Sequence, residues 1–140
     1  MSGKRVNILK NRAKAFLDLA RELIERGQLD LASFSAEQAS QLRVKATLLR
    51  LLGEIPRIHS IRELLGLLAK KLEEMGYSSE ADAVSSFVRE NRGVIINIES
   101  AYTESRYGLF NVREKDVREM LRVIEKFFKL LEVIENAVLG

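Results

Sequence analysis

Two carboxamides and an amine interrupt the apolar face of a helical segment near the start of the chain. On a helical wheel, Gln38, Gln41 and Lys45 point into the middle of one broad face. The apolar residues of that face are Phe34, Leu42, Leu48, Leu49 and Leu52. A buried ammonium group without a partner costs several kcal/mol, so Lys45 must be paired or reach solvent. In a polar cleft, these groups suit a phosphate or a nucleotide; in a core, they form a network that ties helices together.

A second group of polar residues lies at the end of the helical pattern over residues 81–107. Tyr102 and Arg106 are four residues apart and share a helix face, where an arginine can stack on a ring or bind a phosphate. Glu99 lies at the edge of the same face. Two structural alternatives stay open: an ion pair between Lys45 and Glu99, and a simple helix-end role for Arg106, where a cation suits the macrodipole.

The only histidine, His59, lies in the loop "GEIPRIHSI". A catalytic histidine needs an acid or a nucleophile arranged nearby, and the sequence shows neither. Taken alone, His59 is expected to fix the turn through a hydrogen bond.

Helical spacing runs almost everywhere between the few glycines and the one proline. It predicts five helices, over about residues 4–26, 30–52, 60–76, 81–107 and 113–139. Gly53 and Pro56 should end the second helix. Ser60, with Glu63 three residues on, should begin the third. Gly93 should kink the fourth. We therefore predict an all-α, five-helix up-and-down bundle formed by a single domain over residues 1–140.

Composition narrows the classes of function. The 140 residues contain no Cys and one His, which excludes disulfides and most zinc chemistry, so no metal site and no cofactor is expected. No apolar stretch reaches the length of a membrane span, and the charged N-terminus does not resemble a signal peptide, so we expect a cytoplasmic protein without membrane contact. The net charge of +3 permits contact with phosphates without requiring it.

The last predicted helix is apolar on more than one side, as in "FFKLLEVIENAVL". Such a face can be covered by a second copy of the chain, so we expect a homodimer. The alternative is that this helix sits centrally in a monomer.

The stretch "FSAEQASQLRVKATLLRLLGEIPRIHSIRELLGLL" resembles the core of the HEPN domain, the higher-eukaryote and prokaryote nucleotide-binding domain. The shared features follow one another in order: Gln38-Ala39, Leu42 to Ala46, Gly53 to Pro56, His59 and Leu64-Leu65. In addition, "SRYG", with Arg106-Tyr107, resembles the family's Arg-Tyr-Pro segment, although Gly108 stands where Pro is usual. The resemblance covers roughly residues 10–110.

This resemblance implies a compact helical bundle, usually dimeric, with a nucleotide-binding or RNA-directed role. Members often work beside a small nucleotidyltransferase, and many are ribonuclease toxins with an Arg, four to six residues, and then a His. Here four residues follow Arg92 before Asn97, and positions 111–113 after Arg106 are Asn, Val and Arg. Because Asn cannot shuttle a proton as imidazole does, we expect no catalytic residues of that kind.

The leading hypothesis is a HEPN-like module that binds a nucleotide or another phosphate-bearing ligand in a polar cleft between the second and fourth predicted helices. Lys45 and Arg106 would hold phosphates, and His59 could contribute from the rim. The remaining ligand-orienting residues would be Gln38, Gln41, Tyr102 and Tyr107. The alternatives are a ribonuclease of a toxin–antitoxin system with a degenerate Arg-His motif, for which RNA is the substrate, and a non-catalytic dimerising interaction protein.

Overall fold

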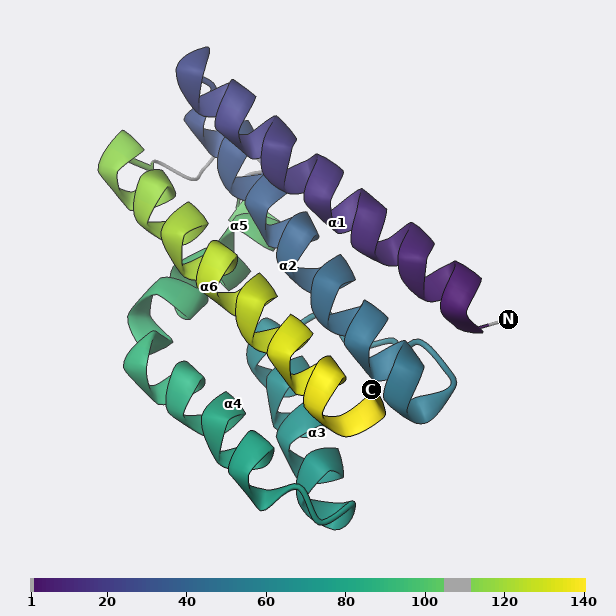
Figure 1. Ribbon diagram of the computed structural model, residues 1–140. Coiled ribbons are helices and arrows are strands. Elements are labelled where there is room, and N and C mark those ends of the chain that lie inside the picture. Colours follow the sequence, from purple (N-terminus) through teal and green to yellow (C-terminus); the bar gives the residue numbers. More distant parts are fainter. Residues whose placement is uncertain (1, 105–111) are drawn as a thin grey trace.

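The computed structural model describes residues 2–104 and 112–140, and every regular element in these ranges is a helix (Figure 1). The helices are α1 (Ser2–Glu25), α2 (Leu29–Leu52), α3 (Ile61–Glu74), α4 (Ser78–Glu90), α5 (Arg92–Glu104) and α6 (Glu114–Leu139). None of these helices has the length and apolar content that crossing a membrane requires. The all-α class is thus confirmed.

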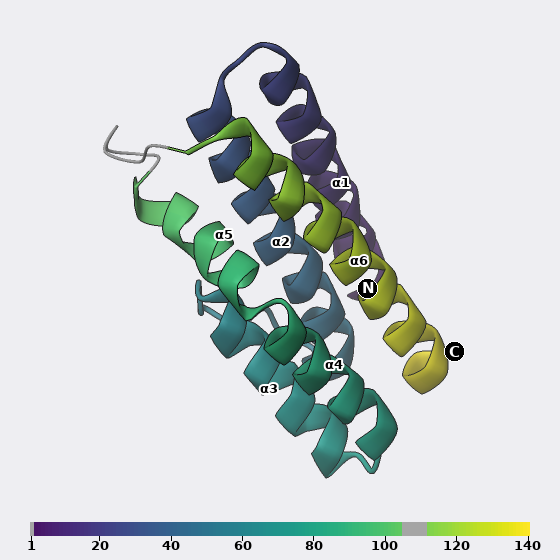
Figure 2. The same cartoon turned by 90° about the vertical axis from the view of Figure 1, so that its left-hand side faces the viewer.

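The fourth predicted helix is in fact two, so the prediction of one helix over residues 81–107 was wrong. The break falls at Asn91, two residues before Gly93, where a kink was expected. Asn91 leaves helical geometry with φ −121° and ψ 21°, and its side-chain amide donates to the carbonyl of Phe87 at 2.9 Å. Asn and Gly are both poor helix formers, and their proximity explains the interruption. Figure 2 shows α4 and α5 following each other along one side of the bundle.

Helix ends follow the local signals of the sequence. Gly53 ends α2 in the left-handed conformation (φ 81°) and donates its N–H to the carbonyl of Leu49. Gly27, after α1, also has a positive φ of 73°. Ser60 begins α3, and its hydroxyl accepts a hydrogen bond from the backbone N–H of Glu63. The predicted caps at Gly53 and Ser60 are therefore confirmed.

Helix α2 is the centre of the bundle, because it packs against α1, α3, α5 and α6 (Figure 1). Most of its residues from Ala32 to Leu49 are buried. Small side chains let α1 approach closely. They are Ala13 and Ala20 of α1 and Ala32, Ser35, Ala36 and Ala39 of α2. Ser35 also donates a hydrogen bond across to the carbonyl of Phe16 at 2.7 Å.

The apolar core lies between α2 and the helices that cover it. Its larger members include Leu48 from α2, Leu64, Leu65, Leu68 and Leu72 from α3, Ile95 and Ile98 from α5, and Met120, Ile124, Phe127 and Leu131 from α6. The apolar stripe of α6 is thus mostly covered within this chain, although Val133 is 64% exposed. The expected homodimer stays a prediction.

A buried carboxylate joins three helices. Glu135 of α6 is 1% exposed and accepts hydrogen bonds from Arg43 (2.9 Å), Thr47 (2.7 Å) and Arg50 (2.9 Å) of α2. Lys10 of α1 forms an ion pair with it at 2.9 Å. Burial alone would raise the pKa of Glu135, but these hydrogen bonds and nearby positive charges lower it to about 2. We call these five residues the Glu135 cluster.

Replacing Glu135 by Gln should lower the free energy of unfolding by about 3–5 kcal/mol, because three cations lose the charge on which they converge. Chemical unfolding at pH 7 measures the change. Glu132→Gln is the matched control: Glu132 also contacts Lys10 and Arg43, but its side chain is 54% exposed. Its loss should lower that free energy by about 1 kcal/mol or less. Equal effects of the two substitutions would contradict a stabilising role for the buried Glu135 carboxylate.

The Glu135 cluster also predicts an acid-sensitive fold. The pKa of Glu135 is lowered in the folded state, so its contribution is present above the unfolded value of 4.5 and is lost as pH falls towards 2. The loss should approach about 3 kcal/mol for this residue. Unfolding curves between pH 5 and pH 2 should therefore fall more steeply for the wild type than for Glu135→Gln.

Candidate functional site

A second buried carboxylate lies on another face of α2. Glu37 is 0% exposed and accepts hydrogen bonds from the side-chain amides of its neighbours Gln38 (2.8 Å) and Gln41. Glu37, Gln41 and Lys45 are spaced four residues apart and therefore share one face of the helix. Helix α5 is one of the helices that pack against α2. Two of the polar residues that the sequence singled out, Gln41 and Lys45, are thus buried, whereas Gln38 is half-buried.

The carbonyl of Gln41 connects the carboxylate to two cationic or basic groups. Its Oε1 accepts a hydrogen bond from Lys45 Nζ at 3.3 Å and lies 3.3 Å from Nδ1 of His59. The His59 ring stacks on Tyr102 of α5, with ring centroids 5.4 Å apart. The α2–α3 loop and α5 therefore place an exposed imidazole and a half-buried phenol beside the inner amides. We call Glu37, Gln38, Gln41, Lys45, His59 and Tyr102 the Glu37 cluster.

Glu99 of α5 borders the Glu37 cluster. It accepts a hydrogen bond from the hydroxyl of Ser60 at 2.8 Å and forms an ion pair with Arg62 at 2.5 Å. The suggested Lys45–Glu99 ion pair is therefore wrong, because Ser60 and Arg62 hold the Glu99 carboxylate and Lys45 is bonded to Gln41 instead. Glu99 anchors α5 to the start of α3.

Burial perturbs both charged groups at the ends of the Glu37 cluster. It raises the pKa of Glu37 to about 7, although the amides of Gln41 and Gln38 and the charge of Lys45 act in the opposite direction. Burial also lowers the pKa of Lys45, and Glu37 opposes that change. The carboxylate is thus poised between its two protonation states near neutral pH.

The amine of Lys45 is only partly used. Lys45 is 9% exposed, and among the described residues its ammonium group makes one hydrogen bond, to an amide, and no ion pair. An ammonium group carries three donors, so two remain available. Buried charges in proteins are normally paired. The arrangement can therefore accept an anionic or strongly hydrogen-bonding ligand, with His59 and Tyr102 beside it.

The structure brings together five of the seven residues singled out in the sequence: Gln38, Gln41, Lys45, His59 and Tyr102. The other two, Arg106 and Tyr107, lie outside the described residues. Glu37 was missed, yet its spacing of four and eight residues from Gln41 and Lys45 was visible in the sequence. Within the described ranges no group of His, Asp and Glu could hold a metal ion.

The residues at the degenerate nuclease positions do not join the Glu37 cluster. Arg92 and Asn97 both lie on the exposed side of α5, and neither hydrogen-bonds to Gln41, His59 or Lys45.

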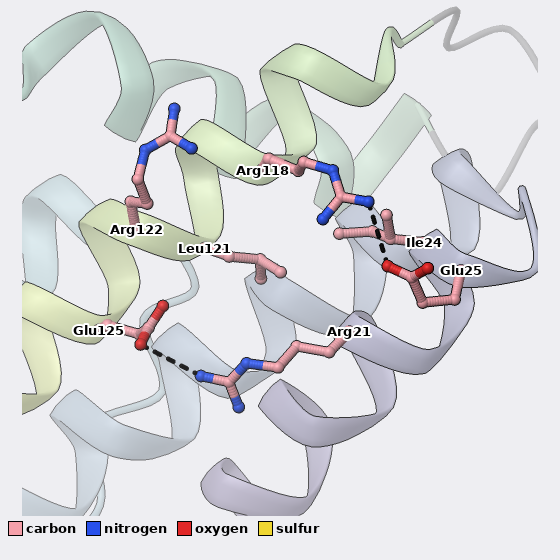
Figure 3. A pocket seen from close by; sticks show the side chains of 7 residues that line it. All are labelled: Arg21, Ile24, Glu25, Arg118, Leu121, Arg122 and Glu125. Atoms are coloured by element: carbon pink, nitrogen blue, oxygen red, sulfur yellow. Dashed lines mark hydrogen bonds and ion pairs between the residues drawn. The ribbon is translucent and has the colours of Figure 1, made fainter.

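A separate hollow of about 300 Å³ lies between α1 and α6 (Figure 3). Ile24 and Leu121 contribute apolar surface to it, and it is lined by Arg21, Glu25, Arg118, Arg122 and Glu125. Arg118 pairs with Glu25 at 3.1 Å and Arg21 with Glu125 at 3.4 Å. These contacts join the two helices across the hollow. Arg122 forms no ion pair with the described residues, which makes it a useful comparison for Lys45.

The comparisons with known proteins agree with this architecture. A family model of the HEPN domain matches residues 6–134. No curated protein sequence matches the chain. The matched stretch takes in nearly all of the sequence, and every described element is helical, as that family requires. The chain therefore belongs to the HEPN domain family, whose members are helical modules of the nucleotide-binding or ribonuclease type.

Proposed function

We propose that this HEPN domain binds a nucleotide or another phosphate-bearing ligand at the Glu37 cluster. The observation that carries the proposal is the amine of Lys45, which is buried and makes one hydrogen bond to an amide at 3.3 Å. Retaining a buried charge with spare donors is unfavourable for folding, so a role in binding accounts for it better than a role in stability.

Each residue has a role in this proposal. Lys45 contacts the phosphate, and His59 donates from the rim through a protonated ring nitrogen. Gln41 and Gln38 are held in place by the hydrogen bonds that they donate to Glu37. Tyr102 supplies a ring beside His59. By the family resemblance, Arg106 and Tyr107, which follow α5 in the sequence, add a second phosphate contact and a second ring.

The proposal includes no catalytic step, because the family's Arg-to-His spacing is absent from the sequence. The resemblance further suggests a separate nucleotidyltransferase as a partner and a homodimer as the working form. Cleavage of RNA by the pure protein, lost in Arg92→Ala or Arg106→Ala, would favour the ribonuclease alternative instead.

Isothermal titration calorimetry tests the binding directly. The titrants are inorganic phosphate, AMP, ADP, ATP and the unphosphorylated nucleoside adenosine, at pH 7 and low salt. We expect at least one phosphorylated compound to bind and adenosine to bind more weakly. Lys45→Met should weaken the binding about tenfold or more, because it removes a charge-assisted hydrogen bond.

Two substitutions outside the cluster serve as matched controls. Lys129→Met removes an exposed lysine of α6, and Arg122→Met removes the arginine without an ion pair in the α1–α6 hollow. Both should leave the dissociation constant unchanged. Absence of binding to the whole panel, or a loss in Arg122→Met that Lys45→Met does not share, would refute the proposed site.

The ligand-free stability of Lys45→Met separates a binding role from a structural one. At pH 6 we expect its free energy of unfolding to equal that of the wild type or to exceed it by up to about 2 kcal/mol, because a buried amine is replaced by an apolar chain of similar length. Chemical unfolding without added anions measures it. A loss of stability larger than about 1 kcal/mol would show that Lys45 mainly holds the bundle together.

A further inference from the structure

The side-chain amide of Gln41 hydrogen-bonds to both Glu37 and Lys45. They form no direct ion pair; instead, Gln41 donates its Nε2 to Glu37 and accepts Lys45 Nζ at its Oε1. A carboxylate can only accept hydrogen bonds, so an ionised Glu37 requires the NH₂ group of Gln41 to point inwards. The Gln41 carbonyl must then face outwards. There it accepts a hydrogen bond from Lys45 Nζ and lies 3.3 Å from Nδ1 of His59.

A protonated Glu37 reverses this requirement. The neutral acid has an O–H donor, which the Gln41 carbonyl can accept if the amide turns by about 180°. The other Glu37 oxygen can still accept from Gln38. The turned amide presents its NH₂ group outwards and releases Lys45 and His59. The outward-facing groups then change from one acceptor with two bound partners to three groups that can donate to an anion.

We propose that an anion binding beside Lys45 is accompanied by the uptake of one proton by Glu37 and by the rotation of the Gln41 amide. This inference rests on the proposed function, since it assigns the regulation of that same site. It also makes Glu37 a positioning residue, which acts on the ligand through Gln41 without touching it.

The charges around Glu37 agree with this coupling. Lys45 on α2 lowers the pKa of Glu37, and Glu99 on α5 raises it, with burial as the largest influence. Arg62 of α3 is paired with Glu99, and His59 of the loop reaches Glu37 only through Gln41. An anion beside Lys45 adds negative charge near Glu37, as the Glu99 carboxylate already does. It therefore favours the protonated form of Glu37 further.

Glu37→Gln tests the proposal as a gain of function. A glutamine at this position donates permanently to the Gln41 carbonyl, as the protonated acid does. With ADP as the probe, wild-type affinity should fall by up to about tenfold per pH unit above pH 7, the slope expected for one linked proton. Glu37→Gln should lack that fall and bind ADP more tightly than the wild type at pH 8.5.

Calorimetry of ADP binding at pH 8 in buffers of different ionisation enthalpy counts the protons directly. The wild type should take up close to one proton more than Glu37→Gln, while protonation of ADP is common to both proteins. Glu132→Gln, which removes a carboxylate that contacts Lys10 and Arg43 outside the Glu37 cluster, is the matched control and should keep the wild-type proton uptake.

The outcomes separate the two proposals. If the wild type binds ADP but Glu37→Gln shows the same pH profile and the same proton uptake, the coupling is refuted and the binding site stands. If none of the panel binds to any variant, both fail. A ligand-free readout is also available: the side-chain NH₂ resonances of Gln41 should shift between pH 6 and pH 8 in the wild type and not in Glu37→Gln. If the Gln41 side-chain resonances of the wild type do not change with pH, the rotation of the Gln41 amide is refuted.

Discussion

A helix that is buried along most of its length can turn few of its polar groups to water, and α2 is such a helix. It packs against four of the five other helices and still carries Glu37, Gln41, Arg43 and Lys45 among its buried residues. Each of these groups must therefore find its partner within the protein or in a ligand. The bundle resolves this constraint differently on two faces of α2.

The Glu135 cluster is electrostatically complete. Its carboxylate receives three donors from α2 and an amine from α1, so it links the last helix to the first two. The Glu37 cluster is incomplete, because its carboxylate meets amides and its amine makes one bond to an amide. The first holds its carboxylate firmly ionised, while the second leaves one poised near neutrality. The complete cluster accounts for a structural role, and the incomplete one is where we propose that a ligand binds.

Local sequence signals predicted the helix ends well, since Gly53 and Ser60 act through their own backbone and side chain. The inward placement of Gln41 and Lys45 also followed from helical spacing alone. The burial of Glu37 and Glu135 did not follow from helical spacing, because a glutamate on a helix is normally solvated and only the packing of other helices encloses it. Helical spacing also could not predict the hydrogen-bond partner of Lys45. That partner is Gln41, because Ser60 and Arg62 already hold the Glu99 carboxylate.

The fixed position of α2 also limits how the site can respond to a ligand. Its backbone is held by α1 and α6 through the Glu135 cluster, and its small residues pack closely on α1, so shifting the helix would break buried contacts. Rotation of one side-chain amide breaks none of these. A change of protonation at Glu37 needs only that rotation to alter the hydrogen bonds offered to the outside. A rigid helix with one adjustable amide is therefore enough to couple proton and anion, and no rearrangement of the bundle is required.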